Sequence, residues 1–452
     1  MKGFISKNKF SILMVLFFAF LLFFRLHNAI NFNPYWGYDG GAHLEYIKMV
    51  MEKWRVPTMA ENYLGWHEPL FYFLYAILGK AASAFCHNNF LTCTVKILQI
   101  ISALLSVVMI FLVYKISQKF SNNKNVWLAA VVGSGLISVM TETSNYLTNE
   151  LLATFLIVSL FHCFIVFSQR GWNIKRIGLI GLISGVALLT KLSAAIFVLA
   201  LVIWFLYKAV YEKRVKYLFY VFIFLFLSFL LYTPWAIYKV KNLGGAFSIN
   251  IFEDKIKEDR KLPEAFFHSF NGEIFTNPFW MTGSNSFISV IFADAFSDYY
   301  AIANNVDKNN LTVPDEEKFW TEAGSFVTNV KFRLSILLLY FSVFFVFIFT
   351  AGVLGLFWRW LKNKFRPNAN LFFLIFIAGC FLALFYNAAK YPFLERGTLK
   401  ASFILPLWPL LMIVGFAWLA AILKKIKKEF FWVVVWFIMI IWGILSILID
   451  WI

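Results

Sequence analysis

The sequence is poor in charged residues, which make up 14% of its 452 residues, whereas apolar types make up 61%. Soluble domains contain about a quarter charged residues and about half apolar ones. Long apolar runs recur along the whole chain, which excludes an ordinary soluble enzyme and predicts an all-α polytopic membrane protein. The short segments of alternating polarity that would indicate a membrane β-barrel are absent.

Other missing features narrow the function further. The sequence has no glycine-rich phosphate loop, which argues against an ATP-driven pump. It shows no internal repeat, whereas transporters usually have repeats and ionisable groups near the bilayer midplane. No small-residue cleavage site follows the first apolar run, so we expect residues 10–27 to form a retained span and not a signal peptide.

Cysteine is scarce, and the four cysteines have no metal-binding spacing. Cys163 and Cys380 lie inside apolar runs, where an inert thiol is expected. Cys86 and Cys93 bracket a short polar loop and would form a disulfide if that loop faces an oxidising compartment. The sequence alone leaves this pairing open.

Acidic residues are outnumbered, with 24 against 41 basic residues and a net charge of +17. The basic residues fall in short connectors between apolar runs, which is the pattern of cytoplasmic loops and not of a nucleic-acid-binding surface. Placing these connectors inside predicts eleven spans and an external C-terminus. The predicted spans are 10–27, 95–114, 126–142, 148–167, 178–190, 192–207, 217–238, 334–357, 370–388, 401–422 and 430–450.

We expect one membrane domain over 1–452, with a first external loop at 28–94 and a small helical external subdomain at 239–333. The apolar run 70–85 is short and follows Pro69, so we predict an interfacial helix there. An ordinary span is the alternative, although it would place the next basic connector outside.

Asp39 is the first candidate for chemistry. It follows an aromatic run, precedes two glycines and is followed within two turns by His43 and Glu45. A carboxylate at this position suits a general base that accepts a proton from an acceptor. The alternative is a helix-capping aspartate at the start of an interfacial helix.

His67 and Glu68 form a second cluster directly before Pro69. Proline fits the first turn of a helix, so both side chains would lie at the positive end of that helix. We interpret them as a pair that contacts a phosphate or sugar, against the alternative of simple capping.

Two further candidates lie at the external ends of predicted spans. Glu150 belongs to a short polar segment between two predicted spans that also contains Glu142, Asn145 and Asn149. These side chains either point into the same cavity as Asp39 or lie on a solvated hairpin. Lys191 interrupts a long run that is otherwise uncharged, and it suits a phosphate contact. The alternative for Lys191 is a lysine that extends to the membrane surface.

The loop 389–400 places Tyr391, Arg396 and Lys400 at the outer face, where basic residues are disfavoured. Binding of an anion would explain this exception, whereas incidental loop charge is the alternative.

A divalent cation is a further possibility for the external face. Asp39, His43, Glu45 and Glu150 supply ligand types that such a cation accepts, although their spacing does not require one.

The order of these motifs resembles that of a known family. An Asp39 loop, the segment from His67 to Tyr72, a glycine-rich run ending in Thr190-Lys191 and a late segment from Lys400 to Pro409 follow one another. This order resembles the GT-C superfamily of polyprenyl-phosphate-sugar-dependent glycosyltransferases. The most similar branches are the protein O-mannosyltransferases and the lipid A aminoarabinose transferases.

The resemblance implies a multi-helix membrane enzyme that transfers a sugar, with inversion, from a dolichyl- or undecaprenyl-type phosphate at the outer face. It implies that Asp39 is catalytic, that Lys191, Arg396, Lys400 and His67 contact the donor phosphate, and that other residues contact sugar or acceptor. The latter group comprises Glu68, His43, Glu150 and Tyr391.

Two departures from the family pattern concern the same loops. The family often has a second acid after its first one, where this chain has Gly40, and a proline where this chain has Glu68.

The expected partners are a lipid-linked sugar, membrane lipid and an acceptor that is a protein, a lipid or a glycan. A transporter or flippase of lipid-linked sugars is the alternative, and a non-catalytic assembly factor is a third. Residue usage rich in Phe, Ile, Lys and Asn hints at the cytoplasmic membrane of a prokaryote.

Overall fold

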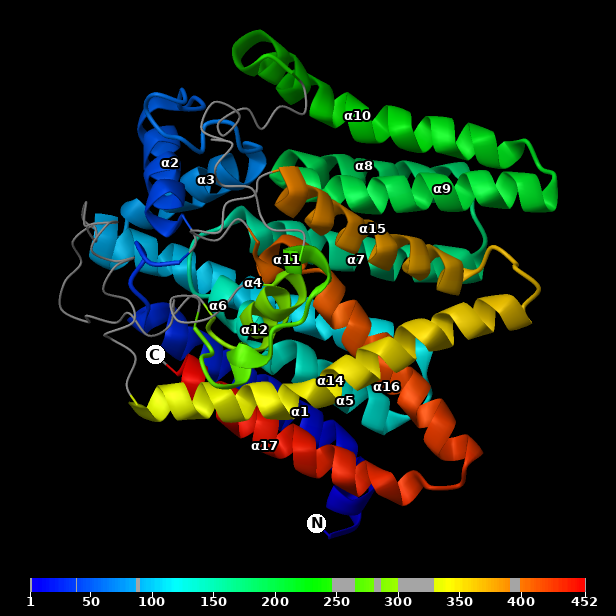
Figure 1. Cartoon of the computed structure of the whole chain (residues 1–452). Coiled ribbons are helices and arrows are strands. Elements are labelled where there is room, and N and C mark those ends of the chain that lie inside the picture. The colour runs from blue at the N-terminus through cyan, green and yellow to red at the C-terminus, as the bar shows by residue number, and fades with distance from the viewer. Residues whose placement is uncertain are drawn as a thin grey trace.

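The computed structural model describes residues 2–37, 39–86, 90–245, 265–279, 286–299, 329–390 and 399–451. These residues form helices and connecting turns, and no strand occurs among them. Long helices make a bundle, with α2 and α3 at one end and the α14–α15 connection at the other (Figure 1). The α-helices are α1 Lys2–Asn31, α2 Gly40–Lys53, α3 Leu70–Ser83, α4 Val95–Phe120, α5 Lys124–Leu136, α6 Ser138–Thr143, α7 Asn149–Arg170, α8 Ile174–Thr190, α9 Ala195–Glu212, α10 Lys216–Leu243, α11 Ala265–His268, α12 Phe287–Phe296, α14 Asn329–Lys362, α15 Ala369–Lys390, α16 Leu407–Lys425 and α17 Trp432–Asp450.

The predicted all-α polytopic architecture is confirmed. In the described ranges, nine helices are long and apolar enough to cross a membrane, and each coincides with a predicted span. The other two predicted spans correspond to α5 and α8, which have 13 and 17 residues. The span predicted over 126–142 is interrupted at Ile137, whose extended backbone separates α5 from α6. Gly133 and Gly135 weaken the last turn of α5 just before this break.

Aromatic side chains fill the centre of the bundle. Phe161 and Phe164 of α7 contact Phe372 of α15, and the rings of Phe164 and Phe372 are stacked with centroids 3.9 Å apart. Burial of several such rings supplies much of the apolar area that holds the helices together. The helices that position the candidate site therefore rest on a tightly packed core.

Small residues allow two helices to approach closely beside the site. A methyl group on Gly185 of α8 would lie 2.7 Å from the carbonyl oxygen of Ser228 on α10, closer than any normal contact. The Ser228 hydroxyl also donates to the carbonyl of Gly181 at 3.1 Å. This contact fixes α8 against α10, so the end of α8 that carries Lys191 is held by a close backbone packing.

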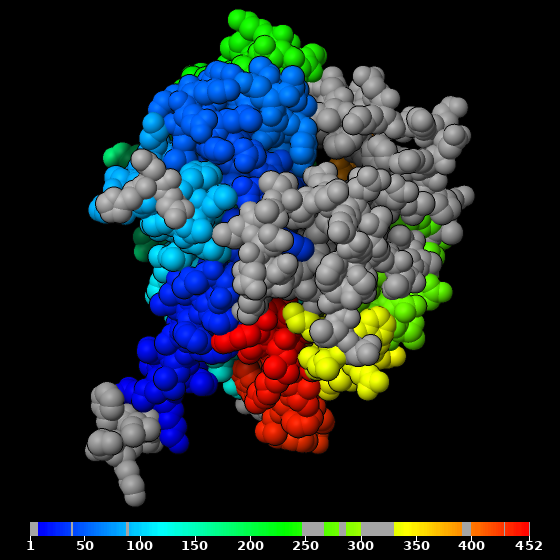
Figure 2. All heavy atoms as spheres, turned by 90° about the vertical axis from the view of Figure 1, so that its left-hand side faces the viewer, coloured from blue at the N-terminus to red at the C-terminus, as the bar shows by residue number. Residues whose placement is uncertain are grey.

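Helices α2 and α3 form a separate small core on one end of the bundle. Tyr46 and Tyr72 are stacked with ring centroids 3.6 Å apart, and both are fully buried. Figure 2 views this end, where α2 and α3 (blue) lie at the upper left of the face and α17 (red) lies at the lower centre. With 14 residues, α3 spans about 21 Å at 1.5 Å per residue, too short to cross a bilayer. This length agrees with the predicted interfacial helix.

The sequence left the pairing of Cys86 and Cys93 open, and the structure joins them by a disulfide. The bond links the end of α3 to the short π-helical segment Phe90–Thr94 that leads into α4. Much of the predicted subdomain 239–333 lies outside the described residues, as do Tyr391 and Arg396.

Candidate active site

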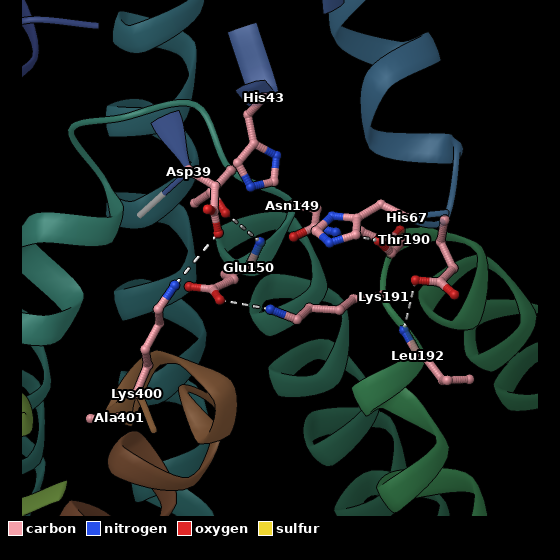
Figure 3. A network of polar contacts seen from close by, with 12 residues as sticks. Asp39, His43, His67, Asn149, Glu150, Thr190, Lys191, Leu192, Lys400 and Ala401 are labelled. Carbon is pink, nitrogen blue, oxygen red and sulfur yellow. Dashed lines mark hydrogen bonds and ion pairs between the residues drawn. The ribbon is translucent and has the colours of Figure 1, made fainter. Parts of the chain in front are cut away.

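Asp39 lies directly before α2 with a left-handed backbone conformation, φ 55°. Aspartate tolerates this conformation better than most residues. Its carboxylate forms no capping hydrogen bond with α2. Instead, Oδ1 accepts a hydrogen bond from the Tyr63 hydroxyl at 2.7 Å, and Oδ2 lies 3.5 Å from Lys400 Nζ. The capping alternative is therefore not observed, and the carboxylate faces a cation from a distant part of the chain (Figure 3).

The loop before Asp39 packs directly on Tyr146. Gly37 has φ +101°, and a methyl group there would lie 2.6 Å from the Tyr146 ring. Only glycine meets both conditions, the positive φ and the close contact. Because Tyr146 is fully buried between α6 and α7, this contact anchors the loop that carries Asp39.

A second carboxylate–lysine pair lies beside the first. Glu150 is in the first turn of α7, where Thr148 accepts its backbone N–H as the helix cap. Lys191 is the extended residue that ends α8, and its Nζ lies 2.7 Å from Glu150 Oε1. Both side chains are largely buried, with 18% and 7% exposed. Lys191 is thus held in an ion pair and does not extend freely to the surface.

One aromatic ring lies under both lysines. The Nζ atoms of Lys191 and Lys400 are 5.3 Å and 5.7 Å from the centroid of the Phe403 ring. Contacts of this length are favourable cation–π interactions. Figure 3 shows Asp39, Glu150, Lys191 and Lys400 converging on one region. Two cations, each beside a carboxylate, therefore occupy a common site assembled from α7, the end of α8 and the segment before α16.

Glu68 forms a buried ion pair beside the turn that carries Lys191. Its Oε1 lies 2.8 Å from Lys239 Nζ, and its Oε2 accepts the backbone N–H of Leu192 at 3.2 Å. The side chains of Lys239 and Glu68 are 0% and 3% exposed. Glu68 does not cap α3, so the capping alternative is not observed here either. The pair connects α10 to the turn that presents Lys191.

Two histidines are connected through a buried tyrosine. The Tyr72 hydroxyl lies 2.8 Å from His43 Nδ1 and 3.0 Å from His67 Nδ1. One hydroxyl can donate to one ring nitrogen and accept from the other, so this chain fixes both rings behind Asp39. Tyr72 belongs to the segment that carried the family resemblance, and its role was not foreseen.

The histidines make stability depend on pH. Burial lowers the pKa of His43 from 6.5 to about 4, although Asp39 acts to raise it, and burial also lowers the pKa of His67 well below its usual value. The unfolded chain then binds more protons between pH 6.5 and 4, so the folded state loses stability as the pH falls through this window. We expect the melting temperature in detergent to fall from pH 7 to pH 5, and to fall less in His43→Gln. An equal decrease in both proteins would contradict this assignment.

Asp39 remains ionised throughout that range. Although partial removal from water acts to raise the pKa of this side chain, which is 41% exposed, the nearby Lys400 and His43, with the hydrogen bond from Tyr63, lower the pKa of Asp39 to about 2. The structure thus provides a carboxylate that carries its charge at every physiological pH.

The structure brings together Asp39, Glu150, Lys191 and Lys400, with His43 and His67 behind them. Glu142 does not join them, since its electrostatic neighbours are Asp294, Asp298 and Asp450. Two residues missed from the sequence are Lys239 and Phe403. A lysine at the end of an apolar span and a phenylalanine three residues after Lys400 carry no distinctive signal on their own.

The side chains considered as ligands for a divalent cation do not form a metal site in the part of the chain that the structure describes. No group of three His, Cys, Asp or Glu side chains there is arranged to hold a metal ion. Asp39 and Glu150 instead face lysines, whose positive charge opposes a bound cation.

Comparison with known families gives one match. The family model described as dolichyl-phosphate-mannose-protein mannosyltransferase matches residues 93–238. This segment contains Glu150 and Lys191, whereas Asp39 and Lys400 lie outside it. No curated protein matches the sequence.

Solved structures of an archaeal oligosaccharyltransferase share the fold. The enzyme of Archaeoglobus fulgidus tethered to an acceptor peptide containing the NVT sequon aligns with a TM-score of 0.57 and 14% identity, over 99% of this chain and 56% of its own. The same enzyme, AglB, with an inhibitory peptide and a dolichol-phosphate gives 0.56 and 15%, over 98% and 56%. The chain thus spans about half the length of that protein.

The helical bundle, the family model and the structural matches agree with the predicted resemblance to the GT-C superfamily. The family match falls on the helices that carry Glu150 and Lys191, and the structural matches extend over nearly the whole chain.

Proposed function

We propose that the protein transfers a sugar from a polyprenyl phosphate to an acceptor, and that Asp39, Lys191 and Lys400 are the residues that carry out this transfer. The observation that carries the proposal is the convergence of two lysines on Phe403, each beside a carboxylate. Such an arrangement suits a reaction in which a phosphate leaves and a hydroxyl or amine loses a proton.

The lysines bind the donor phosphate in this proposal. A phosphate entering between Lys191 and Lys400 forms charge-assisted hydrogen bonds with both cations. It competes with Glu150 for Lys191 and with Asp39 for Lys400. The Asp39–Lys400 contact is the longer one, at 3.5 Å against 2.7 Å, so Lys400 is the cation that a ligand takes over more easily.

This competition prepares Asp39 for its role. A carboxylate whose pKa is about 2 is a weak base, and Lys400 is the largest favourable cause of that low pKa. Once the donor phosphate engages Lys400, the pKa of Asp39 rises and its Oδ2 becomes available to the acceptor. Donor binding therefore makes Asp39 a stronger base.

The transfer itself is a single displacement. The acceptor oxygen or nitrogen attacks the anomeric carbon of the sugar from the face opposite the phosphate and gives its proton to Asp39. The bond between that carbon and the phosphate oxygen breaks, and the oxygen takes the electron pair. Lys191 and Lys400 stabilise the new charge on the polyprenyl phosphate. Displacement from the opposite face inverts the anomeric configuration.

The basic connectors support an external location of the site. The C-terminal ends of α7 at Arg170, α14 at Lys362 and α16 at Lys425 carry basic residues and point away from Asp39. Basic residues favour the cytoplasmic side of a membrane, which supports cytoplasmic ends for these helices and a site at the outer face. The structural relative is described with a dolichol-phosphate, which agrees with a polyprenyl-phosphate donor for this chain.

Glu68 is a positioning residue in this account. Its two oxygens hold Lys239 and the Leu192 N–H, so it fixes the turn that carries Lys191 without touching the substrate. His43 and His67, joined through Tyr72, similarly support the loop of Asp39.

Lys191→Gln is expected to lower the release of free polyprenyl phosphate by roughly 100-fold, because the leaving phosphate loses one of its two cations. The measurement uses the purified protein in liposomes with a panel of polyprenyl-phosphate sugars and an acceptor extract, followed by mass spectrometry. Lys241→Gln, which removes an exposed lysine at the end of α10, is the matched control. Donors that stay intact across the panel in the wild type would favour transport of lipid-linked sugars instead.

A further inference from the structure

A second polar region lies at the opposite end of the bundle from Asp39. A cavity of about 420 Å³ opens there between the C-terminal ends of α4, α7 and α14, the second half of α9 and the start of α15. Gln169 on its wall is 19 residues after Glu150 on α7, which corresponds to about 28 Å of helix. This distance is close to the thickness of the hydrocarbon core, so the cavity lies at the level of the other lipid headgroups.

The lining of this cavity is basic. Lys119, Lys208 and Arg359 contribute to it, and none of its lining residues is acidic. Lys208 pairs with Glu212 at 3.1 Å. Lys119 and Arg359 form no ion pair with any residue in the described ranges. At least two positive charges at the cavity are therefore left without a compensating carboxylate.

Arg359 lies over the Trp418 ring, 5.2 Å from its centroid, and has no carboxylate partner in the described ranges. Two neutral donors at the same wall lack hydrogen-bond partners. Ser168 and Trp172 line the cavity, and their Oγ and Nε1 atoms are shielded from solvent and make no hydrogen bond within the described part of the chain. Buried donors of this kind are usually satisfied by protein, water or ligand. Helix α15 begins at Ala369 on the same wall and directs the positive end of its dipole towards the cavity.

We propose that this cavity binds a phosphate group, held by Lys119 and Arg359 with the hydroxyl of Ser168 and the indole N–H of Trp172. Its volume falls within the range of pockets that bind small ligands. Phosphate matches the set of donors because it accepts several hydrogen bonds and carries the compensating charge. The phosphate belongs either to the headgroup of an anionic lipid or to a soluble phosphate compound. The site is separate from the transfer site and independent of whether transfer occurs.

Native mass spectrometry of the full-length protein in detergent tests this proposal. The protein is titrated with phosphatidylglycerol, which carries an anionic phosphate, and in a separate arm with inorganic phosphate. Lys119→Gln with Arg359→Gln removes the two cations, and Lys362→Gln with Lys425→Gln removes two exposed charges at the same face outside the cavity. Melting temperatures confirm that each variant is folded, and Lys119→Arg with Arg359→Lys retains the charges.

The expected result is phosphatidylglycerol binding that is weaker by about tenfold or more in the Gln pair at the cavity and unchanged in the control pair. The charge-retaining pair should restore most of the affinity. Displacement of the lipid by inorganic phosphate, or binding of inorganic phosphate alone with the same dependence on Lys119 and Arg359, identifies a soluble phosphate compound as the ligand. Equal lipid and phosphate binding by the wild type and the cavity pair would overturn the proposal, and so would an equal loss in the control pair.

Discussion

Asp39→Asn is expected to lower the rate of sugar transfer by roughly 10²- to 10⁴-fold, the contribution of a positioned general base. Asparagine keeps the size of the side chain and can still accept the hydrogen bond from Tyr63. It cannot take a proton from the acceptor, and it removes the negative charge that competes with the donor phosphate for Lys400. The rate should therefore fall while the affinity for the donor stays the same or increases.

The measurement follows the rate of polyprenyl phosphate release and the affinity for the intact donor in the same preparation. Glu52→Gln is the matched control, because it neutralises an exposed acid on α2 away from the site. A decrease in donor affinity with an unchanged rate would assign Asp39 to binding. A rate within about tenfold of the wild type would remove Asp39 from the chemistry.

Lys239→Met is expected to destabilise the folded protein by about 3–5 kcal/mol, because it leaves the Glu68 carboxylate buried without its cation. Both members of the pair are almost fully buried, so solvent does not screen the unpaired charge. The double variant Glu68→Gln with Lys239→Met should recover much of this loss. In the double variant, glutamine can still accept the Leu192 N–H that Glu68 now accepts.

Unfolding in detergent by increasing denaturant compares these variants. The control is Lys53→Met, whose ion pair with Glu61 is exposed, with 47% and 27% of the side chains accessible. We expect that change to cost far less than Lys239→Met, because solvent screens an exposed pair. A similar cost for Lys53→Met and Lys239→Met would show that the buried pair has no special role in holding the turn of Lys191.

The fold could be predicted from the sequence largely because membrane spans are long and uniformly apolar. The hydrophobic runs predicted the order of the helices. The basic connectors predicted which connections between spans lie inside and which lie outside. The break at Ile137 could not be seen this way, since isoleucine fits a helix and the two glycines before it lie inside an otherwise apolar run. The short length of α3 was predictable because its run is short and starts after Pro69.

The site was predictable only in part. Asp39, Lys191 and Lys400 stood out because charge is costly beside apolar helices. Their partners could not be assigned, because Lys400 comes from more than 350 positions later in the chain than Asp39. Glu68 looked like a substrate contact because its neighbour Pro69 marks a helix start. The structure instead pairs Glu68 with Lys239, a lysine that in the sequence only marked the start of an external segment.

The central claim is that the protein breaks the bond between sugar and polyprenyl phosphate and passes the sugar to an acceptor. Its most direct test is a single-turnover reaction in liposomes, in which mass spectrometry quantifies free polyprenyl phosphate and glycosylated acceptor together. The account predicts that both products form in equal amounts in the wild type and that both are lost in Asp39→Asn. Intact donor that crosses the vesicle membrane without forming either product would contradict it.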